Sequence, residues 1–410
     1  MIKLDKETAK SIFYHAGPRI LATLVNLLLI PIVLASFEVA DYGIYALYLS
    51  VALASMIFTF PRISFESKVD LARGDDEAFL ACLSDRFLLS LPILILPVPV
   101  VLLGEGLTAE LNILLFAAVF YGTLFPNILF QAVSSYFIAK EEFLWSSALE
   151  LFRALIAGGF SALAAHKTND LEVYALVKGA LDFSIIFFAF LILSFKRNLI
   201  SPFRRKTYRK SVRNFGIKMV VSDATSTLRL QSTLWIVAFF VGAEGVAVIQ
   251  VAFSSMYRRV ANHVLTLVNV FYAKVARGLP SGQKIDSPKS VFLMLGIGSI
   301  LAFFTIGLAF NYVKWLLPEA FSQVLPLFTI IVAALPFALA SKLVMLKFLV
   351  NLASAKITLV VISSALVQII FCIILVNSIG LIGACIAIVI GSVFELAVTI
   401  SASKWQDVEN

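Results

Sequence analysis

Long apolar segments separated by short polar stretches run through the whole chain. A transmembrane helix needs about 20 mostly apolar residues. Twelve segments meet this requirement in turn: 12–37, 42–62, 87–104, 111–138, 144–165, 171–194, 215–241, 244–271, 291–315, 320–341, 357–376 and 379–402. Prolines inside several segments are compatible with membrane helices, because neighbouring helices satisfy the backbone groups that a kink releases. The pattern predicts an all-α polytopic membrane protein with about twelve transmembrane helices.

The composition supports this fold class. Of the 410 residues, 60% are hydrophobic and 14% are charged, whereas soluble domains average about 45–50% apolar and about 25% charged residues. A single water-soluble globule could not bury this much apolar surface. The three cysteines, Cys82, Cys372 and Cys385, lack the spacing of a metal or redox site. We expect no cofactor and no metal.

Basic residues are concentrated on alternate connections between the predicted helices. The segments 1–11, 62–86, 139–143, 195–218, 272–290, 342–356 and 403–410 hold 25 of the 33 Lys and Arg residues. The opposite connections and the adjoining helix ends hold only Lys167 and Lys314. Because cytoplasmic loops carry the excess of Lys and Arg, both termini are predicted to be cytoplasmic. The net charge of +8 is then a consequence of topology, and we expect no nucleic-acid partner.

A strongly basic stretch, KRNLISPFRRKTYRKSVR (196–213), divides the chain near its centre. We interpret it as a topology determinant and linker, with binding of anionic lipid headgroups as the alternative. Each half opens with a long helix, a very short outer turn and a second helix, and Gly43 and Gly245 occupy corresponding turns. Two six-helix lobes in the same orientation imply a parallel repeat around a central cavity. The predicted division is an N-terminal lobe at 1–195, a linker at 196–214 and a C-terminal lobe at 215–410.

Motifs of enzymes and ATP-driven pumps are absent from the sequence. It contains no GxxxxGK[ST], HExxH, GxSxG or CxxC arrangement. The Asp75-Asp76 pair resembles the carboxylate pairs of metal-dependent glycosyltransferases, but its place in a short inner loop favours a solvated turn over a catalytic site. The outer connections are too short to hold an active site. We therefore expect a protein that is not an enzyme.

Ionisable residues at membrane depth are the informative chemistry of the chain. Each costs roughly 2.5–3.5 kcal/mol at the centre of a membrane helix, so such groups are expected to face an interior or a watery cavity. The cations are Arg19, Arg153, Lys178, Arg229, Arg258 and Arg259; the acids are Glu150, Asp182, Asp223 and Glu395; His15 and His263 can titrate near neutral pH.

Some of these charges have a structural explanation. Glu150 and Arg153 are three residues apart on one predicted helix, and Lys178 and Asp182 are four apart. Pairs at this spacing face each other and can neutralise each other. Glu395, near a cytoplasmic helix end, can extend to the interface or pair with Lys404. These local pairs remain an alternative to a functional role.

Four arginines have too few acids nearby for such pairing. They are Arg19, Arg229, Arg258 and Arg259, and Asp223 is the acid closest to them on the seventh predicted helix. Arginine stays protonated and offers a bidentate fork to phosphate oxygens. We predict that these arginines bind an anionic substrate; the alternative is pairing with acids elsewhere or packing at cytoplasmic helix ends. Candidates for coupling to H⁺ or Na⁺ are Asp223, Asp182, Glu150 and His263.

Three motifs resemble the polysaccharide exporters of the multidrug/oligosaccharidyl-lipid/polysaccharide (MOP) superfamily. They are Asn26-Leu-Leu-Leu-Ile-Pro-Ile-Val-Leu followed by Asp41-Tyr-Gly-Ile-Tyr-Ala-Leu-Tyr, Thr233-Leu-Trp-Ile-Val followed by Gly242-Ala-Glu-Gly-Val-Ala-Val, and Ile379-Gly-Leu-Ile-Gly-Ala-Cys-Ile-Ala. Their order and spacing cover nearly the whole chain. The chain is most similar to the Wzx-type O-antigen flippases, which have twelve helices, whereas lipid II flippases of the superfamily usually carry two more.

The resemblance implies a secondary-active flippase of the bacterial inner (cytoplasmic) membrane. Such a protein moves undecaprenyl-diphosphate-linked oligosaccharide, the repeat unit of O-antigen or a related polysaccharide, by alternating access. The implied partners are this lipid-linked oligosaccharide, H⁺ or Na⁺ as coupling ion, membrane lipid and other polysaccharide-assembly proteins. One alternative is a cation-coupled multidrug exporter of the related branch, whose cationic substrates fit poorly with a positive interior. The other is a membrane O-antigen polymerase, which typically carries a periplasmic loop larger than any predicted here.

Overall fold

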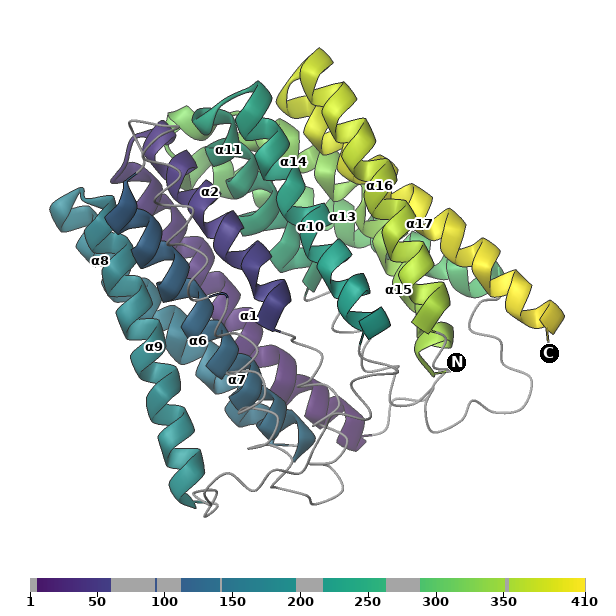
Figure 1. Cartoon of the computed structure of the whole chain (residues 1–410), viewed down its shortest axis with the longest axis horizontal. Helices are drawn as coiled ribbons and strands as arrows, with labels where there is room; N and C mark the ends of the chain where they lie inside the picture. Colours follow the sequence, from purple (N-terminus) through teal and green to yellow (C-terminus); the bar gives the residue numbers. More distant parts are fainter. Residues whose placement is uncertain are drawn as a thin grey trace. The chain divides into compact units, whose positions relative to one another are not determined.

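The computed structural model describes residues 6–59, 93, 112–140, 142–196, 217–262, 288–350 and 354–409. All secondary structure within these ranges is helical (Figure 1). Within them, nine helical stretches are long and apolar enough to cross a membrane: Gly17–Ala35, Val39–Thr59, Ile113–Ile138, Leu144–Thr168, Leu171–Phe195, Lys289–Leu316, Glu319–Leu346, Ala355–Ile379 and Leu381–Ser403. The predicted spans at 215–241 and 244–271 are helical as far as they are described. The predicted span at 87–104 lies outside the described residues, apart from Ile93.

The described chain divides into two compact units. Unit 1 comprises Met1–Glu38 and Tyr48–Val220, and unit 2 comprises Val39–Leu47 and Val221–Asn410. The helix α2 (Val39–Ser55) therefore contributes its first turns to unit 2 and its remainder to unit 1. The predicted linker at 196–214 lies outside the described residues, so the lobe boundaries at 195 and 215 remain a prediction.

Unit 1 is built from the helices that follow the N-terminus. They are α1 (Lys6–Ala35), the 3₁₀ turn η1 (Met56–Thr59), α6 (Ile113–Ala139), α7 (Phe143–Phe152), the π-helical segment η2 (Arg153–Gly158), α8 (Gly159–Thr168) and α9 (Leu171–Lys196). Helix α1 packs on α7 and α8, and α6 packs along α9. The α6–α9 contact is very close at Gly122, where an added Cβ would lie 2.9 Å from Cα of Gly179.

Unit 2 is built from the helices after residue 216. They are α10 (Ile217–Phe240), α11 (Ala243–Ile249), the π-helical segment η5 (Gln250–Tyr257), α13 (Pro288–Leu316), the 3₁₀ turn η6 (Glu319–Phe321), α14 (Val324–Val332), α15 (Leu335–Val350), α16 (Ser354–Ile379) and α17 (Leu381–Glu409). The last two run side by side as a long antiparallel pair (Figure 1). Helix α15 packs against both α13 and α17.

Several of the connections that the structure describes are short turns, among them those at Asn169, Gly242 and Gly380. Asn169, with φ of 51°, ends α8, and Oδ1 of Asp170 then accepts a hydrogen bond from the backbone N of Glu172 at 2.8 Å. Gly242 and Gly380 lie between α10 and α11 and between α16 and α17, at φ of 95° and 61°. Such left-handed conformations favour glycine because a Cβ would clash with the backbone.

The predicted span at 320–341 is interrupted and extended. Helix α14 ends at Val332, and α15 begins at Leu335 and continues to Val350. Pro336 explains the interruption, because it has no backbone N–H to donate to the carbonyl of Val332. The backbone N of Ala334 instead donates to the carbonyl of Ile331 at 2.9 Å, which tightens the turn between the two helices.

Candidate functional site

In unit 1, ion pairs join charged residues on different helices. Nε of Arg19 on α1 lies 3.0 Å from Oε2 of Glu150 on α7. Arg153, at the start of η2, donates from Nε and Nη2 to the two carboxylate oxygens of Asp182 on α9, at 3.1 and 3.2 Å. Its guanidinium also lies 4.7 Å from the ring centre of Phe130. The pairs thus connect α1 to α7 and the α7–η2 stretch to α9.

These pairs differ from the same-helix pairs that the sequence suggested. Glu150 pairs with Arg19 rather than with Arg153, and Asp182 pairs with Arg153 rather than with Lys178. Nζ of Lys178 instead lies 3.3 Å from the Tyr174 hydroxyl. For Asp182 the physical reason is that the planar guanidinium of Arg153 binds both carboxylate oxygens when it approaches from a neighbouring helix. Arg19 therefore has an acidic partner that sequence reasoning did not identify.

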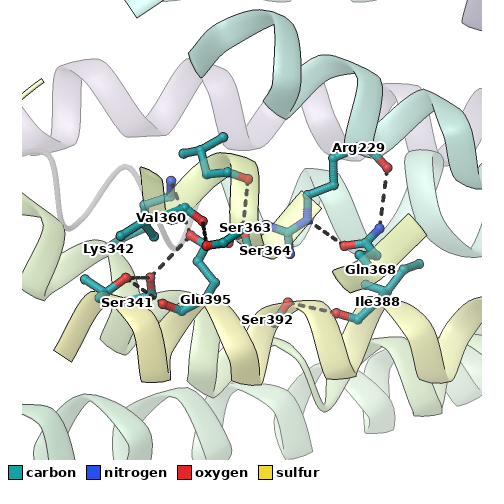
Figure 2. Close-up of polar contacts among 12 residues, drawn as sticks. Arg229, Ser341, Lys342, Val360, Ser363, Ser364, Gln368, Ile388, Ser392 and Glu395 are labelled. Carbon is teal, nitrogen blue, oxygen red and sulfur yellow. Dashed lines mark hydrogen bonds and ion pairs between the residues drawn. The ribbon is translucent and has the colours of Figure 1, made fainter. Parts of the chain in front are cut away.

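In unit 2, the guanidinium of Arg229 on α10 is surrounded by oxygen atoms from two other helices (Figure 2). Nη1 donates to Oε2 of Glu395 on α17 at 2.5 Å and to Oγ of Ser364 on α16 at 3.1 Å. Nε donates to Oε1 of Gln368 on α16 at 2.6 Å. Burial of a charged group is costly unless the group is paired and hydrogen-bonded. Here the carboxylate supplies the opposite charge, and the hydroxyl and amide oxygens accept further hydrogen bonds.

Glu395 is itself held from a further helix. Oγ of Ser341 on α15 donates to Oε1 of Glu395 at 3.2 Å, and Nζ of Lys342 lies 3.9 Å from the same oxygen. Thr399 donates to the backbone carbonyl of Glu395 at 2.6 Å, and its hydroxyl lies 3.2 Å from that of Ser341. The carboxylate therefore connects α10, α15 and α17 (Figure 2).

A glycine leaves the space for this arrangement. A Cβ added to Gly391 on α17 would lie 2.7 Å from Oε1 of Gln368 and 3.1 Å from Nη2 of Arg229. The amide of Gln368 is fixed on its other side, because Nε2 lies 3.3 Å from the Thr233 hydroxyl and 3.4 Å from the backbone carbonyl of Arg229. We call the set Arg229, Ser364, Gln368, Gly391 and Glu395 the Arg229 cage.

Helical spacing places these residues on common faces. Gly391 and Glu395 are four apart on α17, and Ser364 and Gln368 are four apart on α16, so each pair lies on one side of its helix. Sequence reasoning missed Glu395 as the partner of Arg229, because it compared charges along single helices. A search for polar residues and glycine at i, i+4 within apolar helices would have found the signal.

Arg258 and Arg259 follow the π-helical segment η5. Within the described ranges, no carboxylate lies at ion-pair distance from the partly buried Arg258. Arg259 lies near Tyr312 on α13 and has a further interaction within the chain. Single π-helical turns inside α-helices are rare and occur frequently at functional sites. Of the four predicted substrate arginines, Arg258 is the one for which the structure shows no acidic partner among the described residues.

The remaining predicted residues are placed only in part. Asp223 lies on α10, partly buried, six positions before Arg229. The side chains of His15, His263 and Lys404, together with Asp75, Asp76 and Cys82, lie outside the described part of the chain. Among the described residues, no group of three or more His, Cys, Asp or Glu could hold a metal ion.

No protein-family model and no curated protein matches the sequence, whereas solved transporter structures match nearly its full length. The lipid II flippase MurJ, in an inward closed conformation, has 14% identity over 98% of this chain and 88% of its own, with a TM-score of 0.70. An outward-facing MATE family transporter of the MOP superfamily has 14% identity over 100% of this chain and 99% of its own, with a TM-score of 0.62.

A third match is a MOP-superfamily transporter from Pyrococcus furiosus, for which a binding pocket of reverse polarity is described. It has 14% identity over 99% of this chain and 98% of its own, with a TM-score of 0.57. Identities this low establish the fold alone. The chain is an all-α, multi-pass membrane protein with the fold of the MOP-superfamily transporters.

Proposed function

We propose that the chain is a secondary-active flippase for an anionic lipid-linked oligosaccharide. Its substrate is an undecaprenyl-diphosphate-linked repeat unit of O-antigen or a related polysaccharide, which it moves across the bacterial inner membrane by alternating access. The observation that carries this proposal is Arg258, a cation within a predicted membrane span with no carboxylate partner among the described residues. A positive charge at this depth is costly unless a ligand or water compensates it.

The distribution of ion pairs directs the proposal to one pair of arginines. Arg19, Arg153 and Arg229 each have a carboxylate partner, so their charges are already balanced. The positive charge without a carboxylate partner among the described residues is then that of Arg258, and Arg259 lies next to it, pointing about 100° away on the helix. Two adjacent guanidinium groups suit the several oxygens of a diphosphate better than a single carboxylate, because each offers a fork of N–H donors.

A multidrug exporter is the second candidate, because MATE family transporters share the fold. Cationic substrates would be repelled by an unpaired arginine within the membrane, so the local charge favours an anionic substrate. The similarity to MurJ, a lipid II flippase, also favours a lipid-linked substrate. Coupling to H⁺ or Na⁺ is part of the proposal, with Asp223 and His263 as candidates; Glu150 and Asp182 would first have to leave their arginine partners.

The proposal is tested in a deletion strain by gel analysis of surface polysaccharide, with lipid-linked intermediates assayed in parallel. Loss of O-antigen together with accumulation of undecaprenyl-linked repeat units supports a translocation defect. A polymerase defect would leave single repeat units at the surface. Unchanged polysaccharide with altered drug tolerance would overturn the proposal in favour of the exporter.

Point variants in the same strain test the arginines. Arg258→Ala is expected to fail to restore polysaccharide at a normal level of membrane protein, and Arg258→Lys to restore it in part, because it keeps the charge but not the fork. Full complementation by Arg258→Ala and Arg259→Ala alike would contradict the assignment of the substrate site, although not the flippase function.

A further inference from the structure

The Arg229 cage has features of a binding site that is already occupied. The guanidinium uses Nε and Nη1 to reach an amide, a hydroxyl and a carboxylate oxygen, at 2.6, 3.1 and 2.5 Å. The side chain of Arg229 is 13% exposed and that of Glu395 is 12% exposed. We propose that the cage is a preformed guanidinium-binding site filled by the chain's own Arg229, and that Arg229 and Glu395 are positioning residues holding α10 against α16 and α17.

The oxygen atoms of the cage are held in place by contacts that do not involve the Arg229 side chain. Nε2 of Gln368 lies near the Thr233 hydroxyl and the backbone carbonyl of Arg229, both of which remain when the side chain is shortened. Ser341 donates to Oε1 of Glu395 independently of Arg229. Removal of the guanidinium should therefore leave a shaped cavity lined by directed acceptors.

The geometry selects a planar fork over a spherical cation. The oxygens of Gln368 and Glu395 bind different nitrogens of one guanidinium, Nε and Nη1. The third nitrogen, Nη2, lies beside Gly391 on α17. A Cβ at this position would lie only 3.1 Å from Nη2, so the absence of a side chain provides the space for the guanidinium. An ammonium group is a compact point charge and cannot place donors along two such edges at once. The ligand class is thus a small alkylguanidinium.

The same arrangement gives Arg229 a role other than substrate binding. Its donors are directed at partners on α16 and α17, and truncating one member of a buried ion pair leaves the other uncompensated. Lys342 does not replace it, because Nζ is 3.9 Å from the carboxylate and its side chain is 44% exposed. This assigns Arg229 to the internal structure of unit 2 rather than to the binding of an anionic ligand.

The test is rescue of purified full-length Arg229→Ala by ethylguanidinium, which replaces the atoms that the substitution removes. Thermal unfolding is followed by tryptophan fluorescence at constant ionic strength, with ethylammonium and NaCl as matched cations. The variant is expected to unfold at a lower Tm than wild type. Millimolar ethylguanidinium should raise that Tm in a saturable manner, because a ligand of the folded state stabilises it, whereas the other cations and wild-type protein should show no such response.

Two variants make the outcome specific. Arg229→Ala/Glu395→Gln keeps the cavity but removes its charge, and it should lose the response to ethylguanidinium. If Arg229→Ala cannot be purified, Arg229→Lys supplies the test, and it is expected to unfold at a lower Tm than wild type. A Tm equal to that of wild type would contradict the claim that the site requires a planar guanidinium. An absent response in a folded Arg229→Ala, or an equal response to ethylammonium, overturns the proposal. Because no transport substrate enters this assay, its outcome is independent of the proposed flippase function.

Discussion

A Cβ placed on Gly391 would lie 2.7 Å from Oε1 of Gln368, so α16 and α17 approach each other here as closely as a glycine allows. We expect Gly391→Ala to destabilise the protein by about 1–3 kcal/mol, because overpacking forces side chains out of their preferred positions. Unfolding of the purified protein measures the effect. Gly307→Ala on α13 is the matched control, since a Cβ there meets nothing within 4 Å. Equal effects of the two substitutions would contradict the close packing.

The ion pair between Arg229 and Glu395 predicts a non-additive double substitution. Glu395→Ala alone should cost about 3–5 kcal/mol, because it leaves a buried guanidinium without its counter-charge. Arg229→Ala/Glu395→Ala should cost less than the sum of the two single substitutions, since neither charge remains. A double-mutant cycle in unfolding free energy provides the measurement, and additivity would show that the two residues are not coupled.

The bidentate contact of Arg153 with Asp182 predicts that lysine is a poor substitute. Arg153→Lys keeps the charge but loses the parallel hydrogen bonds and the flat contact with Phe130. We expect a stability loss of about 1–3 kcal/mol, measured by thermal unfolding. Lys140→Arg, on a residue that is not part of this pair, is the control. A wild-type Tm for Arg153→Lys would imply that the pair contributes only through its charge.

The charge distribution predicts the orientation of the turns. A single cysteine at Asn169, in the turn between α8 and α9, should react with a membrane-impermeant maleimide from the periplasmic side in intact cells, after the native cysteines are replaced. A cysteine in the basic segment 196–213 should react only after the membrane is permeabilised. The reverse pattern would invert the proposed topology.

The fold could be predicted from the sequence because membrane-spanning helices have a strong local signal. The apolar lengths placed α9 and α16 within a few residues of their observed bounds, and Pro336 in hindsight marks the break before α15. The ion pairs could not be predicted in the same way. Arg229 and Glu395 are separated by 166 residues, and their contact depends on how three helices face one another. Same-helix spacing instead suggested partners for Glu150 and Asp182 that the structure does not form.

Translocation by the purified protein tests the central claim most directly. Proteoliposomes containing an undecaprenyl-diphosphate-linked oligosaccharide are treated with a glycosidase added outside, and the fraction of substrate digested is followed over time. The account predicts that wild-type protein exposes substrate from the inner leaflet, so that digestion passes the outer-leaflet share, and that Arg258→Ala does so far more slowly. If digestion with folded wild-type protein stops at the outer-leaflet share, as it does in protein-free liposomes, the account is contradicted.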